Sequence, residues 1–218
     1  MSDAAKVINI EHDHPLPTDR ILIDSQILVW LCYANSPKQR DKIDQVYEKY
    51  VKRACDAGVE FWHCPLQLSE LGHTIERQER DIYASSSGKT PEQVPLKTFR
   101  YLPRQRKKVA DLVEAAWGSV KELAPNCTEF VLTSDEVDKS LKRFEIERLD
   151  VYDLFFVEVM EQNGIPIILS ADKDFVYATN IILLTANLDV IDLAKSENRL
   201  LNPRTFADQK NARPNDSV

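Results

Sequence analysis

Residues 149–175 read LDVYDLFFVEVMEQNGIPIILSADKDF, and this stretch determines the fold class of the chain. Apolar residues at helical spacing from Tyr152 to Met160 predict a helix that is buried on a broad face. The run Ile165–Leu169 is too short for a helix, is bounded by Gly164 and Ser170, and is rich in branched residues. Such a run predicts a strand that is buried on both faces, which is typical of a central strand in a parallel sheet.

Two aspartates flank this helix and strand. Asp153 lies at the start of the helix, and Asp172 lies just past the strand. In a parallel sheet, a helix that leads into a strand begins at the carboxyl edge of the sheet, where open α/β sheets bind their ligands. We therefore expect the two carboxylates to converge at that edge.

The same alternation of strand and helix continues on both sides of this unit. Strands are expected at residues 20–24, 59–64, 129–133, 165–169 and 180–185, with helices between them. Five such strands predict a doubly wound α/β domain. The length of 218 residues and the hydrophobic content of 43% suit one large domain. We expect this domain at 20–195, a polar leader at 1–19 and a polar, extended or disordered tail at 196–218.

Further acids are expected at the same edge of the sheet. Asp24 directly follows the first strand, Glu70 lies near the start of the helix after the second strand, and Asp150 and Asp174 are close in sequence to the first pair. Like charges ~4 Å apart repel by about 4 kcal/mol at an effective dielectric near 20, and protonation or a cation relieves this repulsion. Oxygen ligands without His or Cys favour Mg²⁺ or Mn²⁺, which assist phosphodiester hydrolysis.

Each acid also has a structural interpretation. Asp150 is favoured as the N-cap of its helix over a metal ligand. Asp153 alone is explained as a first-turn acid stabilised by the helix dipole. Asp172 alone is explained as a turn cap, and Glu70 as a solvated helix residue. Asp24 is harder to explain in this way, and the coincidence of four acids at one edge favours a metal site.

The net charge of −7 argues against an overall basic, nucleic-acid-binding surface. Segment 76–110, however, holds nine Lys or Arg residues against four Asp or Glu residues. We interpret it as an insertion with a loop-like middle, flexible until it meets a partner. Next to Glu70, its cations would attract an RNA backbone; the alternative is a solvated charged surface. The candidate RNA-binding residues are Arg77, Arg80, Arg100, Arg104, Arg106, Lys107 and Lys108.

Other function classes lack support in the sequence. The four cysteines lie singly, without the spacing that zinc needs. The GKT at 88–90 lacks the upstream glycine of a phosphate-binding loop, and no Ser/His/Asp pattern supports nucleophilic catalysis. No apolar run is long enough to span a membrane and no signal peptide is evident, so we expect a cytoplasmic protein.

Four pieces of the chain together resemble the PIN-domain ribonucleases, the class that includes VapC-like toxins. They are ILIDSQ with Asp24 and Ser25, LSEL with Glu70, the run from Tyr152 to Phe175, and the final strand expected at 180–185. The resemblance implies a three-layer α/β/α sandwich whose five-stranded sheet has the order 3-2-1-4-5. It also implies a Mg²⁺ or Mn²⁺ site and endonucleolytic cleavage of RNA that leaves 3′-hydroxyl and 5′-phosphate ends.

The resemblance also assigns roles to individual residues. It implies catalytic and metal-binding roles for Asp24, Glu70, Asp153 and Asp172, a less essential metal-binding role for Asp174, and supporting roles for Ser25 and Ser170. RNA is the implied partner, together with an antitoxin protein if the chain is a toxin. A homodimer through an exposed apolar helix at 27–33 is a further expectation. The long basic segment departs from the compact toxins.

Two other hypotheses stay open from the sequence. One is a non-catalytic PIN-like module that binds RNA or a protein through the basic segment, with structural acids. The other is a phosphatase or receiver-like domain with Asp24 as nucleophile. This last hypothesis is weaker, because the sequence Asp24-Ser25-Gln26 lacks the second acid that phosphate-transferring aspartate motifs use.

Overall fold

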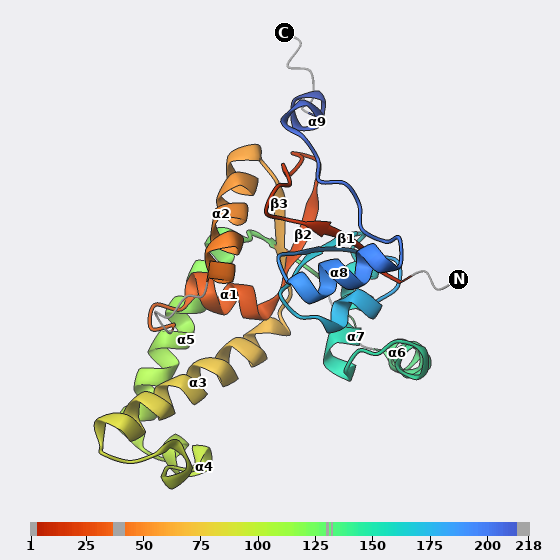
Figure 1. Ribbon diagram of the computed structural model, residues 1–218. Coiled ribbons are helices and arrows are strands. Elements are labelled where there is room, and N and C mark those ends of the chain that lie inside the picture. Colours follow the sequence, from red (N-terminus) through yellow and green to blue (C-terminus); the bar gives the residue numbers. More distant parts are fainter. Residues whose placement is uncertain (1–3, 37–41, 130, 132, 213–218) are drawn as a thin grey trace.

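The computed structural model describes residues 4–36, 42–129, 131 and 133–212. A six-stranded parallel sheet lies at its centre with helices on both faces (Figure 1). Its strand order is β1-β6-β5-β2-β3-β4. The strands are β1 (Lys6–Asn9), β2 (Arg20–Ile23), β3 (Glu60–His63), β4 (Asn126–Cys127), β5 (Ile167–Leu169) and β6 (Ile182–Thr185). The predicted α/β class is confirmed, and the predicted order 3-2-1-4-5 corresponds to β4-β3-β2-β5-β6.

Two hydrophobic cores cover the two faces of the sheet. The first is formed with α1 (Ser25–Cys32), α2 (Lys42–Ala57), α3 (Gln67–Ser86) and α5 (Pro103–Leu123). The second is formed with α7 (Val151–Gln162) and α8 (Leu188–Ser196), and α6 (Ser134–Ile146) packs on α7. The shorter helices are η1 (Pro91–Gln93), α4 (Leu96–Arg100), η2 (Asp174–Tyr177) and α9 (Phe206–Asn211).

The central strands supply side chains to both cores. In β2, Ile21 and Ile23 lie in the first core and Leu22 lies in the second. In β5, Ile167 and Ile168 divide between the cores in the same way. Because successive side chains of a strand point to opposite faces, an uninterrupted apolar run fills both cores. This is the reason that such short strands form the centre of the sheet.

The structure corrects three expectations. The third strand is β4 at 126–127; Phe130 and Leu132 of the predicted 129–133 lie outside the described residues, and Glu129, Val131 and Thr133 are not in a strand. Segment 1–19 contributes β1, which pairs in parallel with β6 and adds a sixth strand. The segment after residue 196 is not extended throughout, because residues 206–211 form α9.

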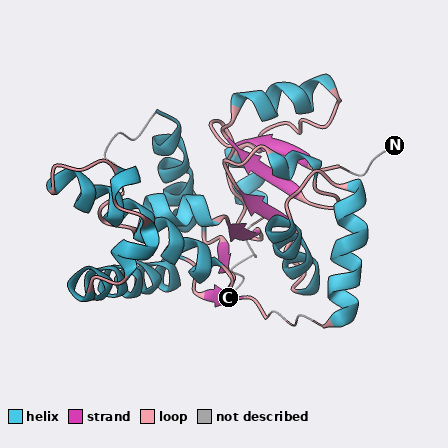
Figure 2. Cartoon of the chain, turned by 90° about the horizontal axis from the view of Figure 1, so that it is seen from below, coloured by secondary structure: helices cyan, strands magenta, loops and turns pink. Residues whose placement is uncertain are grey.

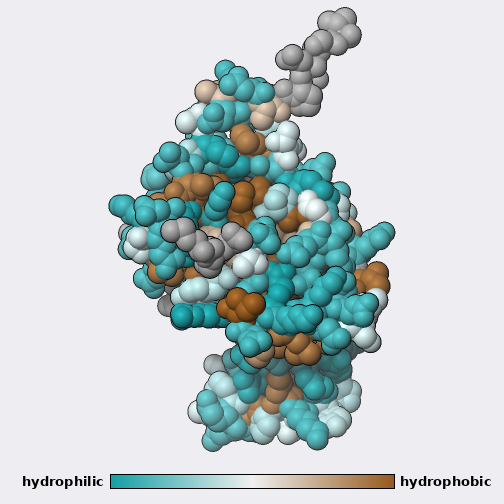
Figure 3. Space-filling model, turned by 90° about the vertical axis from the view of Figure 1, so that its right-hand side faces the viewer, coloured by the Kyte–Doolittle hydropathy of each residue, from teal (hydrophilic) through white to brown (hydrophobic). Residues whose placement is uncertain are grey.

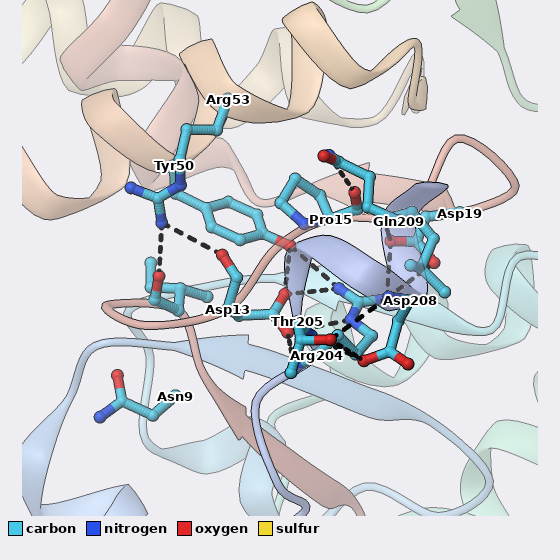
Figure 4. A network of polar contacts seen from close by, with 12 residues as sticks. Asn9, Asp13, Pro15, Asp19, Tyr50, Arg53, Arg204, Thr205, Asp208 and Gln209 are labelled. Atoms are coloured by element: carbon cyan, nitrogen blue, oxygen red, sulfur yellow. Dashed lines mark hydrogen bonds and ion pairs between the residues drawn. The ribbon is translucent and has the colours of Figure 1, made fainter. Parts of the chain in front are cut away.

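A buried polar network attaches this last segment to the domain (Figure 4). Arg204 contacts Asp13 at 2.6 Å through Nη2 and Asp19 at 2.7 Å through Nη1. The Tyr50 hydroxyl, from α2, donates to Asp13 Oδ2 at 3.2 Å. Gln209 of α9 donates to the Pro15 carbonyl. Residues 13–19 and 204–209 are thus held together by specific contacts.

Helices α3, α4 and α5 form an arm that projects from the sheet (Figures 1 and 2). Glu76 of α3 is buried and accepts from Arg100 Nε at 2.8 Å and from Arg106 Nη1 at 3.2 Å. Glu79, one turn further along α3, forms an ion pair with Lys108, whose Nζ lies 2.5 Å from Glu79 Oε2. The segment predicted to be a flexible insertion is therefore a folded helical arm with internal ion pairs.

The apolar helix that was expected to be exposed is buried. Ile27 and Leu28 of α1 belong to the first core and are at most 1% exposed. Exposed apolar side chains lie instead on α6, at Leu141 and Phe144. On the face in Figure 3, hydrophobic residues form separate patches among hydrophilic ones. The premise for a homodimer through residues 27–33 was therefore wrong.

Candidate functional site

A pocket of about 340 Å³ lies at the carboxyl edge of the sheet, where β2 and β5 end. Five carboxylates line it, and neutral side chains line the remainder. The acids are Asp24, Glu70, Asp150, Asp153 and Asp172, and the other residues are Ser25, Gln26, Val29, Trp30, Thr74 and Gln78. The structure thus brings together the four acids that the sequence predicted to converge.

Each acid is positioned by the end of a strand or the start of a helix. Asp24 follows β2 and is the N-cap residue of α1. Glu70 and Asp153 lie in the first turns of α3 and α7. Asp172 follows β5 by three residues. Because β2 and β5 are adjacent and parallel, both chain segments leave the sheet at the same edge.

Ser170 connects the two acids that follow the strands. Its hydroxyl donates to Asp24 Oδ2 at 2.6 Å and accepts from the Asp172 N–H at 2.9 Å. The Ser170 side chain is fully buried, and its carbonyl accepts from the Tyr47 hydroxyl at 3.0 Å. The Tyr47 hydroxyl also accepts from the Ala186 N–H, beyond the end of β6. These bonds fit the supporting role predicted for Ser170, which stays a prediction as far as activity is concerned.

Two further hydrogen bonds fix the helix starts relative to the sheet. Gln67 accepts from the Cys64 N–H and donates to the Ile23 carbonyl at 2.5 Å, so it joins the ends of β3 and β2. The Tyr152 hydroxyl of α7 donates to the Leu66 carbonyl at the start of α3. The first turns that carry Glu70 and Asp153 are therefore tied to each other.

Three carboxylates of the pocket resist ionisation. Burial raises the pKa of Asp24 to about 6, assisted by the charges of Glu70 and Asp172. Burial raises the pKa of Asp153 to about 8, and Asp150 and Asp172 add to this effect. Burial also raises the pKa of Glu70, whereas the nearby Ser25 hydroxyl lowers it. Like charges and desolvation both disfavour the ionised carboxylate, and a cation in the pocket would reverse the effect.

Two neighbouring acids take different positions. Asp150 is the N-cap of α7, as expected, and accepts from the N–H groups of Tyr152 and Asp153 at 2.8 and 2.9 Å. It also lines the pocket. Asp174 does not line the pocket; its N–H donates to Asp172 Oδ1 at 2.8 Å, and it lies in η2. The structure therefore supports Asp174 as a residue that orients Asp172 and not as a member of the pocket.

Most of the predicted RNA-binding cations pair with acids of the arm. Besides the Glu76 and Glu79 pairs, Arg80 contacts Asp81 at 2.6 Å, and Lys107 contacts Asp111 at 2.9 Å. Arg77 contacts His73 instead, at 3.3 Å. The described residues show no acidic partner within 4.0 Å of Arg77 or Arg104. Most of these cations are thus paired with acids of the folded arm, and RNA binding by these residues stays a prediction.

The sequence analysis missed the neutral half of the pocket. Thr74 and Gln78 follow Glu70 at intervals of four residues, which places all three on one face of α3. Gln26 and Trp30 have the same spacing on α1. This periodicity is visible in the sequence once one acid on each helix is assigned to the site.

The donor set fits Mg²⁺ or Mn²⁺. Within the described residues, no group of three or more His, Cys, Asp or Glu side chains is arranged to hold a metal ion on its own. Mg²⁺ usually keeps several waters and binds through one or two carboxylates, so a complete protein cage is not required. Four acids of the pocket could hold such an ion. They are Asp24, Glu70 and Asp153, whose pKa values are raised, and Asp172.

A comparison with protein families identifies the fold. The model of the PIN domain matches residues 21–181, which is most of the chain. The chain belongs to the PIN-domain family. A search of curated proteins returned no significant match. PIN domains are generally metal-dependent nucleases, and the matched region contains β2 to β5, the acidic pocket and the arm.

The match also locates the parts that lie outside the family region. Strands β1 and β6 and helices α8 and α9 are not covered by it. Among the described residues, no helix has the length and apolar character needed to cross a membrane. The pocket, by contrast, lies wholly within the PIN region.

Proposed function

We propose that this PIN-domain protein is a Mg²⁺- or Mn²⁺-dependent endoribonuclease that hydrolyses RNA phosphodiester bonds. The observation that carries the proposal is the convergence of Asp24, Glu70, Asp153 and Asp172 in one pocket of a PIN fold. The raised pKa values of Asp24, Glu70 and Asp153 mark a site where negative charge is concentrated, and none of the described residues that line it is a cation. Perturbed ionisation of this kind in a cleft is typical of functional sites.

The roles of the side chains follow from their positions. Asp24 and Asp172 would hold the ion, and Ser170 would keep their relative orientation through its two hydrogen bonds. Glu70 and Asp153, on opposite helix starts, would complete the ligand set or hold a water by hydrogen bonding. When bound, a divalent ion supplies positive charge for the phosphate and lowers the pKa of water that it binds.

The test is a cleavage assay on single-stranded and structured RNA with a series of Mg²⁺ and Mn²⁺ concentrations. Asp24→Asn and Asp172→Asn preserve side-chain size and remove charge, so cleavage should fall by at least about a hundredfold, more than the loss of an outer-shell partner costs. Asp56→Asn, at an exposed position of α2 outside the pocket, is the matched control and should retain activity. Equal cleavage by the wild type and both Asn variants would refute the assignment.

A non-catalytic PIN module is the second candidate. It is favoured by the lack of a ready-made group of three metal ligands in the described residues. Calorimetric titration with Mn²⁺ separates the two functions. Binding that disappears in Asp24→Asn supports the nuclease, and no binding at millimolar Mn²⁺ supports the module.

Membership of the toxin subgroup, with an antitoxin as partner, is tested by expression in cells. Expression of the active chain should arrest growth, and expression of the Asp24→Asn variant should not.

A further inference from the structure

The pocket continues beyond the acids as a neutral groove. We define this neutral extension by Gln26, Val29, Trp30, Thr74 and Gln78, which all line the same cavity as the carboxylates. Gln26, Val29 and Trp30 belong to α1, and Thr74 and Gln78 belong to α3. None of these side chains is charged. The site therefore has an acidic end and an aromatic, amide-bearing end, and these two ends suit different parts of one ligand.

The two helices carry the extension away from the acids. Helix α1 begins directly after Asp24, and Trp30 lies six residues further on, about 9 Å along the helix at 1.5 Å per residue. On α3, Gln78 lies eight residues after Glu70, about 12 Å along the helix axis. The helices pack against each other in the first core. A ligand with a phosphate at the acids would thus place its next group between Trp30 and Gln78.

Gln78 has an unmet hydrogen-bonding requirement. Its Oε1 atom is buried, and no donor among the described residues lies within hydrogen-bonding distance. A buried acceptor without a partner is unfavourable, and such atoms need an explanation in terms of water or a ligand. Because Gln78 lines the pocket, a donor on a bound molecule would satisfy it.

Trp30 offers a stacking surface at the other wall. Its ring is partly buried and lies 5.8 Å from the Tyr47 ring, centroid to centroid, so the position of the indole is supported from behind. Bases of single-stranded RNA stack on aromatic side chains. The Trp30 indole would contact the face of a bound base, and the Gln78 amide on the neighbouring helix would contact its edge.

The alternative is that Trp30 only closes the core and that Gln78 is a solvated helix residue. The buried, unpaired Oε1 argues against solvation of Gln78. A larger groove of about 680 Å³ on another face of α3 is a weaker candidate for a nucleotide. Its two arginines, Arg100 and Arg106, are already engaged by Glu76.

We propose that the neutral extension is a base subsite for an unpaired adenine next to the phosphate that occupies the acidic end. Trp30 stacks on the base, Gln78 Oε1 accepts the N6 amino hydrogen, and Gln78 Nε2 donates to N7. A glutamine amide matches these two adenine atoms in a bidentate pair. The position of the phosphate rests on the proposed nuclease function, whereas recognition of the base rests on Trp30 and Gln78 alone.

The test measures binding without cleavage. Fluorescence anisotropy of labelled hexauridylate and of the same oligonucleotide with one adenosine is followed on the Asp24→Asn variant. We expect the adenosine-containing RNA to bind about tenfold more tightly, as one good bidentate pair allows. Replacement of that adenosine by 7-deazaadenosine or by purine riboside, which lack N7 and the amino group respectively, should remove most of the gain. These analogues test the contacts without any further change to the protein.

Variants then assign the contacts to residues. Gln78→Leu should abolish the difference between the adenosine-containing and all-uridine RNA, and Trp30→Leu should weaken both by about tenfold through lost stacking. Gln45→Leu, on the exposed side of α2, is the control and should leave both affinities unchanged. Equal binding of the two RNAs to protein with intact Gln78 would overturn the proposal.

The outcomes for the subsite and for the nuclease are separable. Metal-dependent cleavage with the same efficiency next to every base would overturn the subsite and leave the nuclease standing. Adenine-selective binding without cleavage under any metal condition would overturn the nuclease and leave the subsite standing.

Discussion

Two groups of buried carboxylates lie at opposite edges of the sheet, and they differ in whether a cation neutralises them. Asp19 precedes β2 and, with Asp13, is neutralised by Arg204. Asp24 follows β2 and faces Asp153 and other acids, and none of the described residues that line this pocket is a cation. The first group carries its own counter-charge, whereas the second group has none among the described residues. Burial raises the pKa of both Asp19 and Asp24; Arg204 opposes this rise at Asp19, whereas Glu70 and Asp172 add to it at Asp24, where the pKa reaches about 6.

The first prediction removes the counter-charge from the paired group. Arg204→Met should destabilise the protein by about 3–5 kcal/mol, because it leaves two buried carboxylates without their partner. This corresponds to a fall in Tm of about 10 °C for a domain of this size, measured by calorimetry. Adding Asp13→Asn and Asp19→Asn should recover part of the loss. A Tm within about 2 °C of wild type would show that the network contributes little.

The second prediction removes charge from the unpaired group. Asp153→Asn should raise the Tm by several degrees near pH 8 without metal, because the amide relieves repulsion and desolvation of the carboxylate. The same variant should lose RNA cleavage. Thermal denaturation in EDTA and the cleavage assay measure the two effects. A lower Tm in the variant would contradict the claim that this carboxylate destabilises the metal-free fold.

The third prediction concerns pH. The pKa values of Asp24 and Asp153 are raised from 3.8 to about 6 and about 8, respectively. At a pH between 3.8 and these raised values, the folded state therefore holds protons that the unfolded state has released. The free energy of unfolding therefore falls as the pH rises through this window. A cation replaces the protons, so about 10 mM Mg²⁺ should raise the Tm by more near pH 8 than near pH 5.

The rise in Tm that Mg²⁺ causes is compared near pH 8 and near pH 5 in the same protein. Asp24→Asn should reduce the metal-dependent shift in Tm at the higher pH, whereas an Asp13→Asn variant should preserve it, since Asp13 lies at the other edge. A shift of equal size at both pH values would mean that Mg²⁺ binds somewhere other than the acidic pocket.

The smallest effect is expected on the arm. Lys107 and Asp111 form an exposed pair one turn apart on α5, with side chains 77% and 59% exposed. Exposed pairs contribute little to stability. Lys107→Ala should therefore change the Tm by less than about 2 °C, and raising the salt concentration should not alter the difference. A larger loss would indicate that the arm depends on this pair.

The sequence was sufficient to predict the central fold and the convergence of the acids in one pocket. Both rest on local patterns: a short apolar run such as Ile165–Leu169 specifies a buried strand, and an acid after it is placed by the strand direction. Strand β1 and the contact of Arg204 with Asp13 could not be predicted, because their partners lie about 175 to 190 residues away in the chain.

The misplaced strand and the misread basic segment have physical reasons as well. The apolar residues 130–132 favoured a strand, yet the pairing with β3 is fixed earlier, where Asn126 donates to the Phe61 carbonyl. In the basic segment, composition does not distinguish a free cation from one such as Arg100, whose partner Glu76 lies 24 residues earlier. The folded arm results from these pairs.

Helix α3 runs without interruption from the pocket into the arm. It carries Glu70 and Gln78 on one face, and Glu76, which anchors the rest of the arm, on another. At 1.5 Å per residue its 20 residues form a rod of about 30 Å. A tilt of this helix would therefore move the arm and the Glu70 wall of the pocket together. A change in the orientation of the arm would then also change the width of the pocket.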